Sequence, residues 1–164
     1  TNVVLIKSMS KDFGIAGIRA GYAIMNPERV ERLLSNGFLW NSSGLAEFFF
    51  RLFGEEEFQR SYAEVRLRYL DEAAAFFGEL EDVAGIRPFS SKANFCLVRL
   101  DDTIPVDFLV PLLLVRHGVY VRDCRDKVGL EDGQYLRIAA RTDLENRLIL
   151  DALRQVIAEC RTDQ

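Results

Sequence analysis

The chain has 164 residues, which is enough for one compact domain or for one domain and part of another. Its 21 Lys and Arg residues against 25 Asp and Glu give a formal charge of −4, which excludes a protein that binds nucleic acid through bulk positive charge. Hydrophobic residues make up 49%, so we expect a folded core, and no apolar stretch is long enough to predict a membrane span. The chain begins at Thr1 without Met or a secretory leader, and we expect it to be an internal part of a longer polypeptide.

Cysteine and histidine are sparse. Cys96, Cys124 and Cys160 are odd in number and far apart, so their spacing predicts neither a disulfide framework nor a metal or redox site. We therefore expect a reducing, cytoplasmic setting. His117 is the single histidine and lies beside Gly118 at the end of a predicted helix, where a role in capping is favoured over a catalytic one.

The first third of the chain predicts two short strands, over residues 3–6 and 21–25, joined by a small and polar loop over 7–17. Asn26 and Pro27 then predict a helix start, because Asn accepts from unpaired amides and Pro fits the first helical position. The residues expected on the buried face of this helix are Val30, Leu33 and Leu34.

An aromatic-rich run over residues 39–53 predicts packing against another body, and residues 40–43 are a candidate lining for a substrate entrance. A long helix is predicted over 56–80, with acidic residues 55–57 at its start, as the helix dipole favours. One apolar stripe is expected along it, consisting of Tyr62, Val65, Tyr69, Ala73, Phe76 and Leu80. We expect the domain boundary to fall inside this helix, near residues 58–65.

The last half of the chain predicts an α/β module. Its expected strands cover residues 86–89, 95–100, 119–121 and 135–139, and its first helix covers 106–117. Thr142 and Glu145 match a capping box, so a closing helix starts there. The residues expected to face inward from that helix are Leu144, Leu148, Leu153 and Ile157.

The loop after the first strand carries the sharpest chemical signal. Lys11 lies among small residues just past a predicted buried strand, where desolvation yields the neutral amine that attacks a carbonyl. Ser8, Ser10 and Arg19 supply hydroxyl and guanidinium donors suited to a phosphate. Pyridoxal phosphate carries both a carbonyl and a phosphate. An ordinary solvated turn is the competing interpretation, and residue types alone favour it.

Residues 8–34 read SMSKDFGIAGIRAGYAIMNPERVERLL, with a hydroxyl residue, then Ser-Lys, then Gly-x-Arg-x-Gly. This segment resembles the lysine region of fold-type I pyridoxal-phosphate enzymes, and more narrowly the histidinol-phosphate aminotransferase branch, which includes the threonine-phosphate decarboxylases. The resemblance implies that Lys11 carries the cofactor as a Schiff base and shuttles the proton. It also implies that Ser8, Ser10 and Arg19 bind the cofactor phosphate.

Residues 118–142 read GVYVRDCRDKVGLEDGQYLRIAART and resemble the arginine region of the same family. The resemblance implies that Arg137 binds the substrate α-carboxylate and that Arg122 contacts a distal phosphate of the substrate. A planar guanidinium fork pairs with either anion better than lysine does. For Arg122 an exposed arginine with solvent-screened partners is an equally open interpretation, and Arg141 has no firm role.

The resemblance covers nearly the whole chain but only the C-terminal part of such enzymes. It implies an α/β fold, with residues 1–58 closing the large cofactor-binding domain and 59–164 forming the small C-terminal domain. The glycine-rich phosphate turn, the ring that stacks on the pyridine and the Asp that pairs with its nitrogen are then expected outside this chain. The chain alone is therefore not expected to be active, and the family implies a homodimer.

The function that we favour from the sequence is a pyridoxal-phosphate-dependent aminotransferase. Its substrates would be small molecules, an amino acid and a 2-oxo acid or phosphorylated keto compound, with no metal, nucleic acid or membrane as partner. One alternative is a decarboxylase of a phosphorylated amino acid that uses the same cofactor. A second alternative is a non-catalytic domain that keeps the fold for dimerisation or binding.

Overall fold

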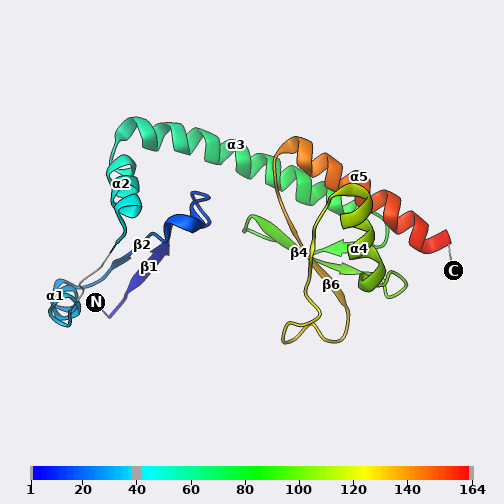
Figure 1. The fold of residues 1–164 in the computed structure, drawn as a ribbon, viewed down its shortest axis with the longest axis horizontal. Helices are drawn as coiled ribbons and strands as arrows, with labels where there is room; N and C mark the ends of the chain where they lie inside the picture. The colour runs from blue at the N-terminus through cyan, green and yellow to red at the C-terminus, as the bar shows by residue number, and fades with distance from the viewer. Residues whose placement is uncertain (1, 38–41, 163–164) are drawn as a thin grey trace. The chain divides into compact units, whose positions relative to one another are not determined.

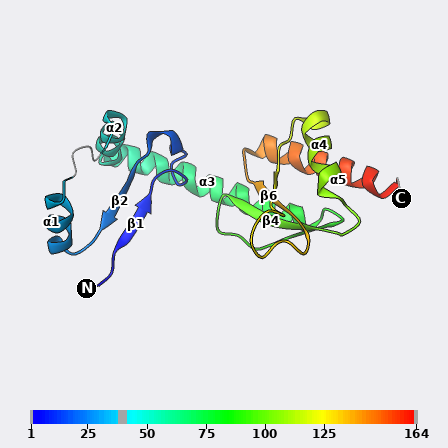
Figure 2. The same cartoon turned by 60° about the horizontal axis from the view of Figure 1, so that its bottom comes forward.

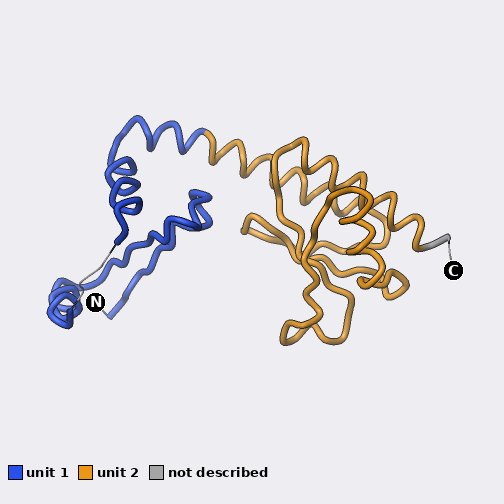
Figure 3. The backbone as a smooth tube through the Cα atoms, viewed as in Figure 1, with its two compact units in different colours: residues 1–64 blue, residues 65–164 orange. Residues whose placement is uncertain are grey.

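The computed structural model describes residues 2–37 and 42–162. The chain divides into two compact units, residues 1–64 and 65–164, which are described separately (Figures 1 and 3). Helix α3 (Glu56–Glu81) begins in the first unit and ends in the second, in agreement with the predicted helix over 56–80. The assignment of residues 1–58 and 59–164 to the two domains of a longer enzyme stays a prediction.

The first unit contains a hairpin of β1 (Leu5–Ser8) and β2 (Gly21–Ile24), with the short 3-10 helix η1 (Ala16–Ile18) in its connection. The strands pair antiparallel from Leu5 with Ile24 to Ser8 with Gly21. A Cβ at position 21 would lie 2.9 Å from the Lys7 carbonyl oxygen, so this pairing requires glycine there. Strand β1 lies two residues later than the predicted 3–6, because its bounds are set by pairing with β2 and not by the apolar run of the sequence.

Helix α1 (Pro27–Ser35) begins as predicted, with the Asn26 side chain accepting a hydrogen bond from Glu28 N at 2.9 Å. The expectation of a buried face was wrong. Between 37% and 55% of the surface of Val30, Leu33 and Leu34 is exposed, because no described element covers this side of the helix.

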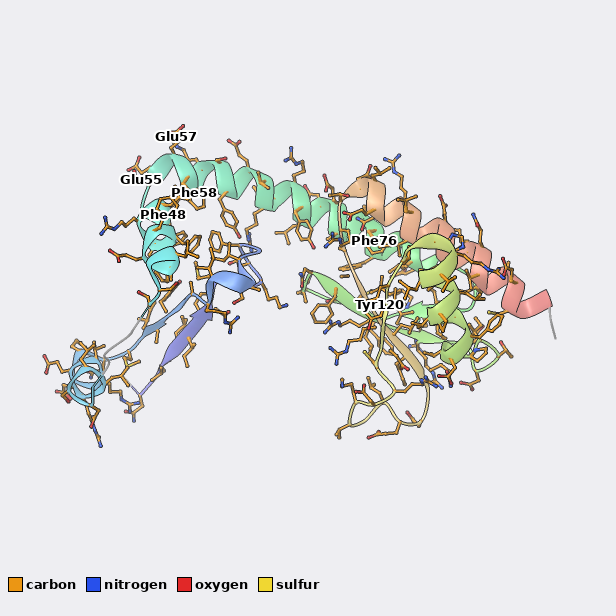
Figure 4. The ribbon with its side chains drawn as sticks, in the orientation of Figure 1. Phe48, Glu55, Glu57, Phe58, Phe76 and Tyr120 are labelled. Atoms are coloured by element: carbon orange, nitrogen blue, oxygen red, sulfur yellow. The ribbon has the colours of Figure 1, made fainter. Side chains whose placement is uncertain are left out.

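Helix α2 (Gly44–Phe53) and the start of α3 enclose a cluster of aromatic rings (Figure 4). Phe13 stacks on Tyr62 with ring centroids 4.1 Å apart and meets Phe49 edge-on at 5.3 Å. Phe58 points from α3 toward α2, whereas Phe48 lies on the outer side of α2. The cluster ties the turn that contains Phe13 to both helices.

The second unit is a four-stranded antiparallel sheet of order β3-β4-β6-β5, with helices packed on one face (Figure 2). The elements are β3 (Ile86–Pro88), β4 (Phe95–Leu100), α4 (Val106–His117), β5 (Arg122–Asp123), β6 (Gln134–Ala139) and α5 (Asp143–Thr162). Burial alternates along β4, where Cys96, Val98 and Leu100 face the helices and are at most 2% exposed. Phe76 from the second half of α3 fills the same core (Figure 4).

The predicted strand over 119–121 was displaced, since the pairing begins only at Arg122. Val119 N instead donates to the Leu113 carbonyl at 3.0 Å, so this segment closes the end of α4. The capping box of α5 is confirmed, because Thr142 N donates to Glu145 Oε2 at 3.2 Å and Glu145 N to Thr142 Oγ1 at 3.4 Å.

The buried faces of the two long helices, α3 and α5, were predicted correctly in part, but some residues assigned to them are exposed. Leu144 and Leu148 of α5 are 70% and 56% exposed, and Val65 of α3 is 51% exposed. The other two residues predicted to face inward from α5, Leu153 and Ile157, are buried as expected, and Leu150 and Val156 complete the stripe that faces the core. No helix in the described part of the chain combines the length and the apolar character needed to cross a membrane.

Candidate active site

Lys11 lies in a tight turn at the end of the β1–β2 hairpin. Phe13 N donates to the Met9 carbonyl at 3.2 Å, which closes the turn around the lysine. Met9 N donates to the Ala20 carbonyl at 3.1 Å, and the Met9 side chain is only 1% exposed. The buried Met9 side chain therefore anchors the turn just before Lys11. The Lys11 side chain itself is exposed and has no hydrogen-bond or ion-pair partner among the described residues.

The predicted phosphate donors gather around the same turn. Ser8 ends β1, and Ser10 lies in the turn directly after it. The bond from Met9 N to the Ala20 carbonyl continues the hairpin pairing by one residue, and Arg19 directly precedes Ala20 along the chain. Arg19 has a φ of +60°, and its Nη1 donates to the Ala16 carbonyl at 2.8 Å.

The chemistry of this donor set fits pyridoxal phosphate. The Lys11 amine suits the cofactor aldehyde, and the hydroxyls of Ser8 and Ser10 with the Arg19 guanidinium suit its phosphate. Ser8 Oγ already accepts from Ser10 N at 3.3 Å, which leaves the hydroxyl proton to be donated to a ligand. The amine and the anion donors thus come from one short segment of backbone.

The two predicted substrate arginines lie side by side on the sheet. Arg122 of β5 and Arg137 of β6 are direct partners in the antiparallel register, and both are exposed. The Arg137 guanidinium lies over the Phe95 ring, 4.9 Å from its centroid. Within the described ranges neither arginine forms an ion pair with a carboxylate. Because like charges directly opposite one another destabilise a sheet, the pair favours an anionic ligand.

Sequence analysis missed the network that anchors the strand of Arg122. Arg125 Nη2 donates to Asp107 Oδ1 and to Asp123 Oδ2, both at 2.6 Å, and Nε donates to Asp123 at 3.1 Å. Hydrogen bonds from Arg125 lower the pKa of both carboxyl groups, and the two carboxylates raise the pKa of Arg125. The network joins the start of the loop after β5 to the first turn of α4.

Other predicted features have structural roles or lie elsewhere. Arg141 pairs with Glu145 at 3.0 Å, and its backbone N donates to Asn146 Oδ1 at 2.7 Å, so it belongs to the start of α5. Cys96 is a core residue as predicted, and burial raises the pKa of its thiol to about 11. Of the predicted entrance segment 40–43, residues 40 and 41 lie outside the described residues. The described residues contain no group of three or more His, Cys, Asp and Glu suited to a metal ion.

Comparison with known proteins identifies the family. The family described as Aminotransferase class I and II matches residues 1–153. The L-serine phosphate decarboxylase of Campylobacter jejuni is 47% identical over 159 residues, which are 96% of this chain and 40% of that protein. The L-serine phosphate decarboxylase of Sulfurospirillum multivorans is 42% identical over 158 residues, with the same two coverages. The chain thus spans about 40% of the length of these relatives.

Solved structures agree with the sequence relatives. A decarboxylase from Sulfurospirillum multivorans matches 94% of this chain with a TM-score of 0.87, and the match covers 44% of that chain. The histidinol-phosphate aminotransferase from Clostridium acetobutylicum is 30% identical, with a TM-score of 0.78 over 95% of this chain and 46% of its own. Both likenesses confirm the α/β fold and its partial extent.

The same comparisons correct the expected reaction. Sequence analysis favoured an aminotransferase over a decarboxylase of a phosphorylated amino acid. The two relatives at 42–47% identity are L-serine phosphate decarboxylases, and the aminotransferase structure shares only 30%, so the aminotransferase assignment was wrong and the alternative is better supported. The motifs misled because both reactions use the same lysine and the same anion donors. The chain belongs to the class I and II aminotransferase family of fold-type I enzymes, which use pyridoxal phosphate, and it forms one portion of that fold.

Proposed function

We propose that the full-length protein is a pyridoxal-phosphate-dependent decarboxylase of a phosphorylated amino acid, with L-serine phosphate as its substrate. The observation that carries the proposal is the 42–47% identity with two L-serine phosphate decarboxylases along 96% of the chain. That similarity includes the lysine turn as well as the arginine pair, so it extends over all the candidate site residues of this chain.

The arginine pair supports this substrate class. A phosphorylated amino acid carries a carboxylate near the reacting carbon and a phosphate at its far end. Arg137 is assigned to the carboxylate and Arg122 to the phosphate, and their Cβ atoms are about 5 Å apart as register partners. Two long arginine side chains that start from neighbouring positions suit two anionic groups separated by a short carbon chain.

Each residue of the lysine turn then has a defined task. Pyridoxal phosphate, when bound, supplies the electron sink for the charge that develops at the substrate Cα. Ser8, Ser10 and Arg19 hold its phosphate, and Lys11 holds its aldehyde carbon. After the carboxylate has left as carbon dioxide, the Lys11 side chain supplies the proton that takes its place on Cα.

The test is an assay of the full-length protein with L-serine phosphate and pyridoxal phosphate. We expect carbon dioxide and phosphoethanolamine in equal amounts, without keto-acid formation. Lys11→Ala is the matched control and should release no carbon dioxide above background. Amino-group transfer to a 2-oxo acid without carbon dioxide release would refute the proposal.

We also infer a homodimer for the full-length protein. Phe48 on α2 is 67% exposed, and so large an apolar side chain on an aromatic-rich helix supports burial against a second subunit. Size-exclusion chromatography with light scattering measures the mass directly, and a monomeric mass at micromolar concentration would contradict the inference.

A further inference from the structure

Lys7 lies just before the lysine turn and Lys11 lies within it, and of these two amines only that of Lys7 has a partner among the described residues. Lys7 Nζ lies 2.5 Å from Asp12 Oδ2 in an ion pair, with the two side chains 40% and 26% exposed. Lys11, one residue before Asp12, forms neither an ion pair nor a hydrogen bond with any described residue. The two amines therefore differ in availability although they share one loop.

Asp12 is itself held from the other side. Tyr62 on α3 donates its hydroxyl to Asp12 Oδ1 at 2.6 Å and lies 2.9 Å from the Asp12 carbonyl oxygen. The Tyr62 ring stacks on Phe13, the next residue along the turn, with centroids 4.1 Å apart. Asp12 thus connects Lys7, the backbone beside Lys11 and helix α3.

We propose that Asp12 is the positioning residue of the lysine turn: it occupies the amine of Lys7 and, through Tyr62, fixes the backbone that presents Lys11. This inference rests on the proposed function, since it concerns which amine the cofactor meets. Asp12 itself touches no reacting atom. It selects between two amines by engaging one of them.

The chemistry at stake is the joining of a lysine to the cofactor aldehyde. The lysine nitrogen forms a bond to the aldehyde carbon, and the amine gives up two hydrogens, which leave with the aldehyde oxygen as water. Borohydride then delivers a hydride to that carbon, a proton from solvent adds to the nitrogen, and the link becomes a stable secondary amine. An amine that donates in an ion pair must first leave its carboxylate before it can attack, so Lys7 is at a disadvantage.

The experiment maps the labelled lysine in the full-length protein. Pyridoxal phosphate is added, the mixture is reduced with borohydride and digested, and mass spectrometry gives the ratio of phosphopyridoxyl label at Lys7 to that at Lys11. Wild type should carry the label at Lys11. In Asp12→Asn the ratio of label at Lys7 to label at Lys11 should rise about tenfold, because the variant loses the charge-assisted hydrogen bond that occupies the Lys7 amine. Asp12→Glu should restore the wild-type ratio.

Asp126→Asn is the matched control, because Asp126 forms the corresponding ion pair with Lys127 in the second unit. It should leave the Lys7 to Lys11 ratio unchanged. Labelling of Lys11 alone in folded Asp12→Asn would overturn the role of Asp12 and leave the proposed function intact. A wild-type protein with no labelled lysine would overturn both.

A second measurement needs no variant and so does not depend on folding of Asp12→Asn. Trace acetylation of cofactor-free wild-type protein with acetic anhydride compares the two amines directly. We expect Lys7 to react about tenfold more slowly than Lys11, because Lys7 must first break its charge-assisted hydrogen bond to Asp12. Equal rates, or faster acetylation of Lys7, would refute the proposal.

Discussion

The substitution Arg122→Gln separates a structural effect of this residue from the substrate-binding role that we propose for it. Arg122 faces Arg137 across the β5–β6 ladder, so its guanidinium repels a like charge in the ligand-free protein. In the proposed function the same guanidinium binds the distal phosphate of the substrate. Removing it should therefore stabilise the ligand-free fold and weaken substrate binding. A residue with a purely structural role would not produce this opposition of signs.

The size of each effect follows from the surroundings of the pair. Like charges directly opposite in a sheet cost between about 0.2 and 1 kcal/mol, and both side chains are exposed, so we expect a gain of up to about 0.5 kcal/mol in the free energy of unfolding. A hydrogen bond to a charged group contributes about 1.5–3 kcal/mol, which corresponds to a rise in KM of about 10- to 150-fold. The kcat should change little if Arg122 binds the phosphate equally in the ground and transition states.

The assay measures KM and kcat for release of carbon dioxide from L-serine phosphate, together with the urea midpoint without substrate. Arg87→Gln is the matched control, because Arg87 of β3 faces Arg99 of β4 as another like-charged pair. Strands β3 and β5 are the two edges of the sheet, so the control should shift the urea midpoint in the same direction and leave KM unchanged. A KM for Arg122→Gln within about twofold of wild type would refute the phosphate assignment.

Three further predictions concern catalysis and stability. Lys11→Ala should abolish turnover in the full-length protein, and retained activity would contradict its role as the lysine that holds the cofactor. Phe76→Ala should lower the free energy of unfolding by about 3–5 kcal/mol, because its ring is 2% exposed in the core, whereas Glu79→Ala on the exposed side of α3 should change it by less than about 0.5 kcal/mol in urea titrations. The Thr142 hydroxyl first, and then Arg141, lower the pKa of Glu145 to about 2, so its stabilising effect is complete above its ordinary pKa and is lost as the pH falls through about 2. The stability difference between wild type and Glu145→Gln should therefore shrink steadily between pH 5 and pH 2, and a difference independent of pH would contradict this.

The elements with local signals could be predicted from the sequence. The Asn26–Pro27 start of α1 and the capping box at Thr142 depend on neighbours a few residues away, and both are found in the structure. Strand β5 could not be placed, because its bounds follow from pairing with Arg137 and from the bond between Val119 N and the end of α4. Such long-range pairing leaves no mark in the composition of a two-residue strand.

Burial was harder to predict than secondary structure. Val30 on α1 has the amphipathic spacing of a buried residue and is nevertheless exposed within this chain, because periodicity identifies an apolar face without identifying what covers it. Leu148 on α5 shows the same error, since the core of the second unit is covered by a neighbouring stripe of the helix. An apolar face is thus a local property, whereas burial is a property of the assembled chain.

The candidate site residues could be proposed from the sequence only where they lie close together along the chain. Lys11 and the donors Ser8 and Ser10 lie within four positions of one another, so a motif could identify them together. Asp107 and Arg125 are 18 residues apart and meet only because α4 and the loop after β5 pack together, and no spacing rule connects them. The link between Asp12 and Tyr62 spans 50 residues and was missed for the same reason.

The error in the expected reaction has a related physical origin. Transamination and decarboxylation share the lysine, the phosphate donors and the carboxylate arginine, and they differ in which bond of Cα stands perpendicular to the cofactor plane. That orientation depends on where the two ends of the substrate are held. In the proposed site, this means the relative position of Arg137 and Arg122, which are register partners, and the anchoring of the neighbouring Asp123 by Arg125. A motif reports which residue types are present, whereas these positions depend on packing throughout the second unit. Similarity along 96% of the chain reflects that packing, and so it could distinguish two reactions that the motifs could not.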